Sequence, residues 1–256
     1  MAHDFEFFSY RKHGKIARVT INRPHVLNAV HFPAVLELEH LADLVAADTD
    51  TRIVAITGAG RAFSTGMDLK ELPKGEVDIG YHEHWERALR RFETMDKIVL
   101  CLLHGYAIGG GLQLALACDI RVGTRSVGMS LPAVTECLIP GLGTFRLARY
   151  IGLGRAKRMT LLGSRIYGEE AERIGLLDHL VDEPTMEEEF EGLIQQYLET
   201  CSTACRLSKQ ALVACFDLGF DQFFDYYLDL QNKAMNSSDY REALAALKAD
   251  RRPVWK

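Results

Sequence analysis

The sequence predicts an α/β fold with parallel strands, followed by a helical C-terminal region. Three observations support this prediction. Short apolar runs typical of strands alternate with longer segments of helical periodicity over the first two thirds of the chain. Glycine clusters stand where several of these runs end and a helix begins. The last third carries one helical segment after another, with no strand pattern beyond 177–181.

The first predicted strand is 16–21, with the sequence IARVTI, and an Asn-Arg-Pro turn follows it. A helix is predicted from 32 to 45 because its apolar residues recur on one face. The apolar run 53–57 (IVAIT) predicts a second strand, which ends at Gly-Ala-Gly. The stretch 71–81 contains a proline, two glycines and several charges, so we expect a loop there.

A second series of elements follows that loop. Apolar residues on one stripe predict a helix over 84–97, and IVLCLL at 98–103 predicts a buried strand. Three glycines at 109–111 lead into a very apolar helix, and a short strand is expected at 120–123. From about 185 to 248 the pattern is helical, and aromatic residues concentrate there. We interpret these aromatic residues as packing on the core or on a neighbouring subunit.

Composition excludes several classes of protein. The chain has 256 residues, of which 48% are hydrophobic and 25% charged, and its net charge of −5 does not favour nucleic-acid binding. No apolar run is long enough for a membrane span, and the N-terminus lacks the apolar stretch of a signal peptide. A cytoplasmic location is therefore expected. The six cysteines form no CxxC pair, so we expect reduced, buried thiols and no metal site.

Two segments could present backbone N–H groups to a ligand. In 56–72 a strand ends, and a Gly/Ser/Thr turn leads to a helix predicted at 68–72. In 103–120 a strand ends, and the glycine triplet leads into the next helix. The first N–H groups of a helix lack internal partners, and glycines let a substrate approach the main chain. Two converging N–H donors could form an oxyanion hole, in which one donor contributes about 3–4 kcal/mol.

Together, and in this order, these segments resemble the crotonase (enoyl-CoA hydratase/isomerase) superfamily nearly from end to end. The resemblance implies a spiral of ββα units over 1–195 and a helical trimerisation region over 196–256. It also implies a homotrimer or a homohexamer built as a dimer of trimers. The motifs that carry it are NRPHVLNAV (22–30), ITGAGRAFSTGMDLKEL (56–72), HGYAIGGGLQLALACDI (104–120) and IPGLGTFRLARYIGLGRAKRMTLLG (139–163).

The resemblance implies an acyl thioester substrate, carried on coenzyme A or a related pantetheine carrier. No separate cofactor is expected, because coenzyme A is part of the substrate. By motif position, the backbone N–H groups of Met67 and Gly110 form the oxyanion hole. Met67 stands where the family usually has a small residue, so its side chain should narrow the pocket. The residues implied in binding the substrate or coenzyme A are Thr65, Met67, Leu69, Lys70 and Gly109, with Lys70 near the phosphates and Asp68 supporting the loop as an N-terminal helix residue.

Family hydratases hold one water between two glutamates, and both are absent by motif position. One glutamate follows the glycine triplet, where this chain has Gln113. The other lies eight residues before the glycine of the IPG turn, where this chain has Ala133. An amide cannot take up a proton at neutral pH, although it can hold a water, and alanine offers no acid–base chemistry. Ordinary two-glutamate hydration is therefore not expected.

Several side chains could replace the missing carboxylates. Glu136 lies three residues after Ala133, so the two share a face if this stretch is helical. A loop at 81–84, with the sequence YHEH, could supply a histidine or a tyrosine as proton donor. A solvated or structural role is the alternative for each of these groups. Structural roles are expected for His104 and Asp119.

Two classes of function remain open on the sequence. The first is an acyl-CoA enzyme of the lyase or isomerase type that uses the hole for decarboxylation, isomerisation, dehydration or hydrolysis. Decarboxylation fits the sequence best, since it forms an enolate without a base. The second is a catalytically silent acyl-CoA-binding homologue. A weak enoyl-CoA hydratase, in which Gln113 positions water, is a further alternative.

Overall fold

The central sheet of the computed structural model, which describes residues 5–255, has six strands in the order β1-β2-β3-β4-β6-β8. Only the pair β1–β2 is antiparallel, and the remaining pairs are parallel. The predicted α/β fold with parallel strands is confirmed. The strands are β1 (Phe8–His13), β2 (Ile16–Ile21), β3 (Ile53–Gly58), β4 (Ile98–Leu103), β6 (Ile120–Thr124) and β8 (His179–Val181).

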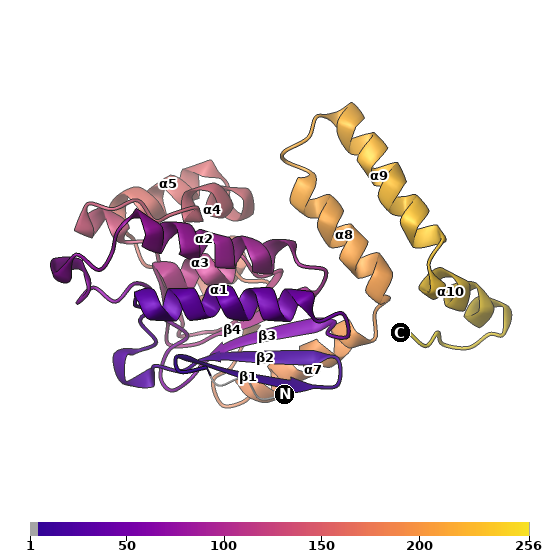
Figure 1. Ribbon diagram of the computed structural model, residues 1–256, viewed down its shortest axis with the longest axis horizontal. Helices are drawn as coiled ribbons and strands as arrows, with labels where there is room; N and C mark the ends of the chain where they lie inside the picture. Colours follow the sequence, from indigo (N-terminus) through magenta and orange to yellow (C-terminus); the bar gives the residue numbers. More distant parts are fainter. Residues whose placement is uncertain (1–4, 256) are drawn as a thin grey trace.

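Helices cover both faces of this sheet (Figure 1). Alternate residues of a strand point to opposite faces, so Val54 and Ile56 of β3 join one buried cluster while Ile53 and Ala55 join another. The first cluster includes residues of α1 (Phe32–Ala47), α2 (Ile79–Thr94) and α3 (Gly110–Leu116), and the second includes residues of α7 (Met186–Leu198). The strands β3 and β4 are apolar along most of their length because both of their faces are covered.

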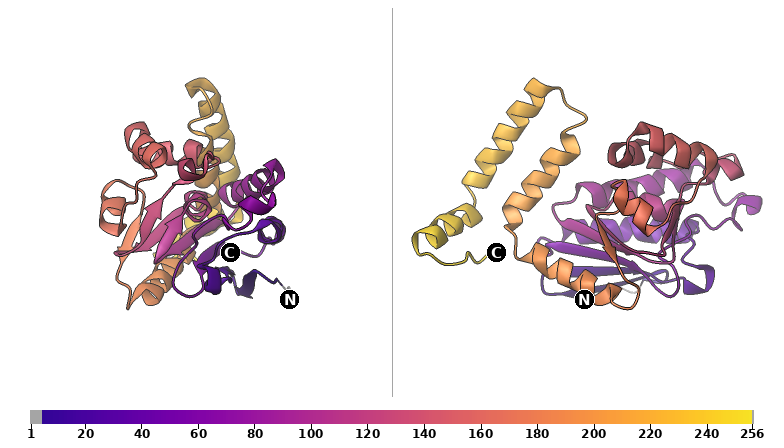
Figure 2. Two further views of the ribbon diagram at one scale, coloured as in Figure 1. Left: turned by 90° about the vertical axis from the view of Figure 1, so that its left-hand side faces the viewer. Right: turned by 180° about the vertical axis from the view of Figure 1, so that it is seen from behind.

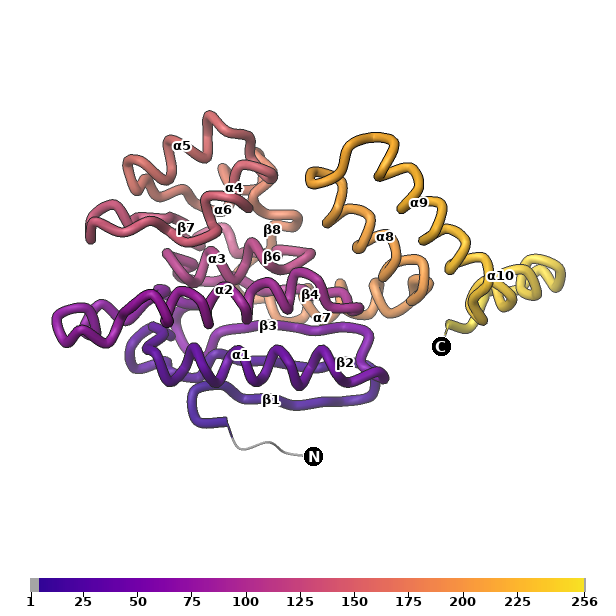
Figure 3. The backbone as a smooth tube through the Cα atoms, turned by 45° about the horizontal axis from the view of Figure 1, so that its top comes forward, coloured from indigo at the N-terminus to yellow at the C-terminus, as the bar shows by residue number. Residues whose placement is uncertain are grey.

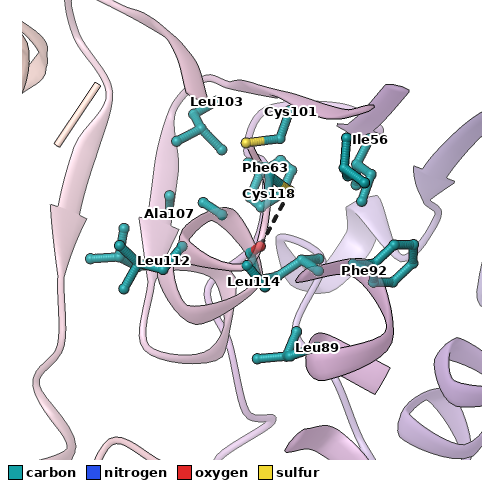
Figure 4. Close-up of a cluster of buried hydrophobic side chains, with 14 of the residues drawn as sticks. Ile56, Phe63, Leu89, Phe92, Cys101, Leu103, Ala107, Leu112, Leu114 and Cys118 are labelled. Carbon is teal, nitrogen blue, oxygen red and sulfur yellow. Dashed lines mark hydrogen bonds between the residues drawn. The ribbon is translucent and has the colours of Figure 1, made fainter. Parts of the chain in front are cut away.

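The larger cluster lies beneath α2 and α3 (Figure 4). Leu89 and Phe92 of α2 belong to this cluster together with Ile56 and Leu103 of the sheet, and the thiol of Cys118 donates to the carbonyl oxygen of Leu114. The six cysteines are all free thiols. Cys101 and Cys118 are buried as expected, whereas Cys137 and Cys215 are exposed, so the expectation of burial is wrong for these two.

Three short strands were not predicted from the sequence. β1 is an edge strand whose second half, Arg-Lys-His, is polar and exposed, so it lacks an apolar pattern. β5 (Tyr106–Ile108) and β7 (Gly128–Ser130) pair with each other in a small separate sheet, and three residues are too few to show a period of two. This small sheet matters because β5 leads directly into the glycine triplet.

The segment between β3 and α2 differs from the predictions. No helix forms at 68–72, where turns occupy the chain and a short 3-10 helix covers Leu72–Lys74. The helix predicted at 84–97 begins earlier, at Ile79, and ends at Thr94. Asp78 caps this helix by accepting from the backbone N–H of Tyr81. The predicted loop at 81–84 is therefore helical, and its side chains have fixed directions.

Helices α4 (Gly143–Ile151), α5 (Leu153–Leu162) and α6 (Gly168–Arg173) follow the small sheet, and the predicted helical C-terminal region follows β8. Beyond α7, a hairpin of α8 (Ser202–Ala214) and α9 (Phe220–Met235) projects from the body and leads to α10 (Ser238–Lys248) (Figures 1 and 2). The tube in Figure 3 shows that α8 is the member of this hairpin that lies nearer the body.

A buried lysine attaches α8 to the body. The ammonium of Lys209 donates to the carbonyl oxygens of Phe92 (3.1 Å) and Lys97 (2.9 Å) and to the carboxylate of Asp119 (2.7 Å). Burial raises the pKa of Asp119, and the nearby Lys209 opposes that rise. This contact gives Asp119 the structural role that the sequence predicted. None of the helices within 5–255 is long and apolar enough to cross a bilayer.

Candidate active site

A cavity of about 120 Å³ opens where the two backbone-donor segments meet. Four parts of the chain line it: the turn after β3, the first turns of α2, the start of α3 and the stretch 132–141. Its volume is several times the space that one water needs. Within 5–255, the structure shows no cluster of side chains that could hold a metal ion.

The two donor segments are joined through their backbones. The N–H of Ser64 donates to the carbonyl oxygen of Tyr106 (2.9 Å), and the N–H of Ile108 donates to that of Ser64 (3.0 Å). Gly66 then packs directly on Gly110, since a Cβ added to Gly66 would lie 2.5 Å from the nitrogen of Gly110. Gly66 also has a φ of +82°, so glycine is required there for two reasons.

This contact places the N–H groups of Met67 and Gly110 on one cavity. Both residues line it, and within 5–255 neither backbone N–H has a hydrogen-bond partner in the protein. Gly110 is the first residue of α3, where an N–H group lacks an intrahelical acceptor and the helix dipole favours negative charge. An oxyanion hole formed by these two N–H groups stays a prediction.

The predicted coenzyme-binding residues divide into two groups. Thr65, Leu69 and Gly109 line the cavity, whereas Lys70 is exposed and lies outside the lining. A role for Lys70 near the phosphates therefore stays a prediction. Asp68 does not begin a helix as predicted. It is buried in the turn, where its carboxylate accepts from the backbone N–H of Lys70 (3.3 Å) and pairs with Arg23 (3.4 Å).

The residues at the two glutamate positions lie on the cavity wall. Gln113 projects from α3, and its carbonyl oxygen is buried without a partner in the protein. Ala133 begins a 3-10 helix, Ala133–Glu136, which also brings Glu136 to the lining. Glu136 accepts from the hydroxyl of Thr135 through Oε1 (2.6 Å), and its Oε2 has no partner among the described residues. Glu136 is thus a half-buried carboxylate in the lining of the cavity.

The other candidate proton donors differ in their hydrogen bonds and in whether they line the cavity. The hydroxyl of Tyr81 donates to the carbonyl oxygen of Val30 (3.0 Å), and burial raises the pKa of Tyr81, so it is held as a structural group. His82 lines the cavity and is half-buried. His84 binds Glu39 (2.5 Å) and His104 binds the carbonyl oxygen of Gly60 (3.0 Å), and neither ring lines the cavity.

Sequence reasoning missed two groups, one in the lining of the cavity and one beside it. Trp85 was placed on the packing stripe of its helix, but it also lines the cavity. The carboxylate of Glu86 lies close to the amide of Gln113, since both side chains approach Gly141. A Cβ added to Gly141 would lie 2.5 Å from Oε1 of Glu86 and 2.7 Å from Oε1 of Gln113. Glu86 is held by the backbone N–H of Leu142 (2.6 Å) and by Arg146 (2.8 Å). No local motif marks these residues, since α2, α3 and the IPG turn come together only in the fold.

The family model for enoyl-CoA hydratase/isomerase matches residues 11–256. The chain belongs to the enoyl-CoA hydratase/isomerase family. The predicted crotonase fold is also confirmed by solved structures. A crystal structure of enoyl-CoA hydratase from Bacillus anthracis superimposes with a TM-score of 0.91 at 28% identity, covering 98% of this chain and 99% of that one.

Similar members of the enoyl-CoA hydratase/isomerase family carry different names. Short-chain-enoyl-CoA hydratase of Clostridium acetobutylicum is 30% identical over 92% of each chain. The 1,2-epoxyphenylacetyl-CoA isomerase of Escherichia coli is 30% identical over 94% of each chain. Membership in the enoyl-CoA hydratase/isomerase family therefore supports an enzyme that processes acyl-CoA, and the reaction must be argued from the cavity itself.

Proposed function

We propose that this chain is an enoyl-CoA isomerase that uses one carboxylate. Its substrate is an acyl thioester of coenzyme A, whose carbonyl oxygen accepts from the backbone N–H groups of Met67 and Gly110. The carboxylate of Glu136 carries this proposal, because it is the one carboxylate among the described residues that line the cavity. Hydration needs two acid–base groups around a water, whereas a proton shift needs one group that can take and return a proton.

The chemistry follows from that arrangement. Glu136 removes a proton from C2 of a 3-enoyl thioester, and the electron pair moves into the carbonyl group to form a dienolate. The two backbone N–H groups stabilise the negative oxygen of this intermediate. The protonated Glu136 then returns the proton to C4, and the double bond moves from C3–C4 to C2–C3. No other reactant is needed, and the atoms balance.

The carboxylate of Glu136 also argues against decarboxylation, the reaction that fitted the sequence best. A malonyl-type substrate would bring its own carboxylate into a cavity that already holds Glu136. No lysine or arginine stands among the lining residues of the described chain to neutralise the second charge. Like charges in a partly dry cavity repel strongly, so the binding of such a substrate would be weakened.

The experiment supplies 3-butenoyl-CoA to the purified protein in D₂O and follows crotonyl-CoA and deuterium incorporation by NMR. We expect isomerisation, with a kcat lowered by at least about a hundredfold in Glu136→Gln. Glu83→Gln is the matched control, since Glu83 is exposed and lies on α2 outside the lining. Release of CO₂ from malonyl-CoA without isomerisation would favour the decarboxylase. Binding of acyl-CoA with no turnover of either substrate would identify a silent binding protein.

A further inference from the structure

The segment that carries the N–H of Met67 lies against a second segment, 27–30. The N–H of Val30 donates to the carbonyl oxygen of Gly66 (2.7 Å), and the N–H of Asp68 donates to that of Val30 (3.0 Å). The carbonyl group of Gly66 and the N–H of Met67 belong to one planar trans peptide group, in which they point in opposite directions. The bond between Gly66 and Val30 therefore sets the direction of the Met67 N–H, away from Val30.

The side chain of Asn28 holds this second segment in place. It is fully buried, and its amide donates to the carbonyl oxygens of Ala59 (2.9 Å) and Ala62 (2.8 Å). Its oxygen accepts from the backbone N–H of Arg23 (2.9 Å). Both N–H donors and the oxygen of the amide are thus used. One side chain joins the turn that follows β2 to the chain that follows β3.

A hydroxyl group connects Asn28 to the segment of Met67. The Oγ of Ser64 donates to the main-chain carbonyl oxygen of Asn28 (2.7 Å) and accepts from the N–H of Gly66 (3.1 Å). Ser64 is also buried, so these hydrogen bonds are shielded from water. A continuous chain of hydrogen bonds therefore runs from Asn28 through Ser64 to Gly66, the residue whose carbonyl group sets the direction of the Met67 N–H.

We propose that Asn28 is a positioning residue for the proposed oxyanion hole. It is not among the described residues that line the cavity, so it acts through the main chain, by keeping the N–H of Met67 aligned with that of Gly110. The inference rests on the proposed function for the role of these two donors. Because the carbonyl oxygen gains negative charge only during the reaction, misalignment of a donor should slow turnover far more than it weakens binding.

Asn28→Gly separates the amide from the backbone conformation. Asn28 has a φ of +57°, and glycine takes this left-handed conformation at no steric cost. In the isomerisation of 3-butenoyl-CoA, we expect kcat to fall by about a hundredfold, the cost of misplacing a group by about 1 Å, while KM stays within about threefold. Ser64→Ala removes only the connecting hydroxyl and should lower kcat by about tenfold. The double variant should be little slower than Asn28→Gly, since both residues act through one chain of hydrogen bonds.

A spectroscopic measurement tests the alignment without turnover. The ligand is butyryl-CoA labelled with carbon-13 at its carbonyl carbon, because it has no double bond to shift. Hydrogen bonds to the carbonyl oxygen lower its infrared stretching frequency, so the ligand should absorb at a lower frequency when bound than in water. Asn28→Gly and Ser64→Ala should each lose most of this shift while still binding the ligand.

Lys209→Met is the control for a loss of stability alone. The ammonium of Lys209 contacts Asp119 and the carbonyl groups of Phe92 and Lys97, none of which belongs to the two segments. Circular dichroism gives the folded fraction of each variant, by which each rate is divided. Lys209→Met should keep both the natural kcat and the natural infrared shift. If Asn28→Gly does not fold, Ser64→Ala carries the test.

The outcomes distinguish the inference from the proposed function. A natural kcat and a natural infrared shift in the folded Asn28 and Ser64 variants would overturn the inference and leave the proposed function in place. A raised KM at natural kcat would also overturn it, because Asn28 would then serve binding alone. If the variants lose the shift that the natural chain shows, but the natural chain does not isomerise 3-butenoyl-CoA, the inference stands and the isomerase proposal fails. A natural chain that binds butyryl-CoA without any shift would overturn the oxyanion hole and the inference together.

Discussion

Gln113 and Ala133 both line the cavity. Their positions were predicted from two motifs, and the fold brings the two residues to the same small volume. If the two family glutamates are absent, as the motifs predict, the chemistry of the cavity changes while the proposed backbone donors of Met67 and Gly110 stay the same. In this proposal, the side chains at 113 and 133 decide the reaction, and the backbone of Met67 and Gly110 binds the carbonyl oxygen.

The first prediction restores the missing acids. We expect Gln113→Glu/Ala133→Glu to hydrate crotonyl-CoA at least about a hundredfold faster than the natural chain, because water would then lie between two carboxylates. Each single substitution should gain far less. Liquid chromatography measures the rate at which crotonyl-CoA is consumed. The control is Gln113→Glu/Thr135→Glu, which adds the same charge at an exposed residue outside the lining. Equal gains in the two double variants would contradict the prediction.

The second prediction concerns the side chain of Met67, which lines the cavity and is half-buried. Met67→Ala should raise the ratio of kcat/KM for 3-hexenoyl-CoA to that for 3-butenoyl-CoA by about tenfold, because space opens for the longer chain. Steady-state kinetics with both substrates measure this ratio. Met186→Ala, in a half-buried methionine of α7, should leave the ratio unchanged. A ratio that does not move in Met67→Ala would show that other residues limit chain length.

Some residues of the site could be predicted from the sequence, and others could not. Thr65, Met67, Gly109 and Gly110 were predicted from the position of their motifs in a sequence that resembles the family, and the glycines near a helix start are the local signals that mark the two segments. Trp85 could not be predicted, because its spacing on α2 is equally typical of a packing residue. Its second role depends on α2 lying across α3, and single-sequence patterns do not contain that packing.

At the scale of elements, the sequence predicted the strands that are buried on both faces and missed those that are short or at an edge. The strand β4 was predicted at its observed bounds because its six residues are all apolar. The start of α2 was missed because Ile79 and Gly80 follow a loop rich in charge and glycine. The Asp78 cap, which accepts from the N–H of Tyr81, is the signal that could have placed it.

The third prediction belongs to α8 and its buried lysine. Lys209→Met should lower the free energy of unfolding by about 3–5 kcal/mol, because the half-buried carboxylate of Asp119 would lose its charged partner. The carbonyl oxygens of Phe92 and Lys97 would also lose their donor. Urea unfolding measures the loss. The control is Lys233→Met, since Lys233 pairs with Asp229 at the surface and should contribute less than about 1 kcal/mol. Equal losses in the two variants would refute a special role for Lys209.

At the scale of the whole molecule, the helices after α7 leave much apolar surface uncovered. Phe220 is 81% exposed and Leu247 is 77% exposed, and both lie on helices that project from the body (Figure 1). Large exposed apolar patches commonly mark interaction surfaces. We therefore propose that copies of this chain associate through the helices α8, α9 and α10, in line with the trimer or hexamer expected from the sequence.

The fourth prediction tests this association by light scattering at micromolar concentration. The natural chain should have a mass that is a multiple of the single chain, and Phe220→Glu should lower that mass because a buried charge would destabilise the interface. Gln222→Glu adds the same charge to α9 without removing an aromatic ring, and it should remain associated. A single-chain mass for the natural protein would contradict the proposed assembly.

The backbone contact between Gly66 and Gly110 has a practical consequence for laboratory evolution. The two peptide segments touch without any side chain between them, so the proposed site for a thioester carbonyl is formed by main-chain atoms. A mutant library could therefore vary the reacting groups while every member keeps the same anchor for the carbonyl. Four positions would suffice to sample different reactions on one scaffold: Trp85, Gln113, Ala133 and Glu136.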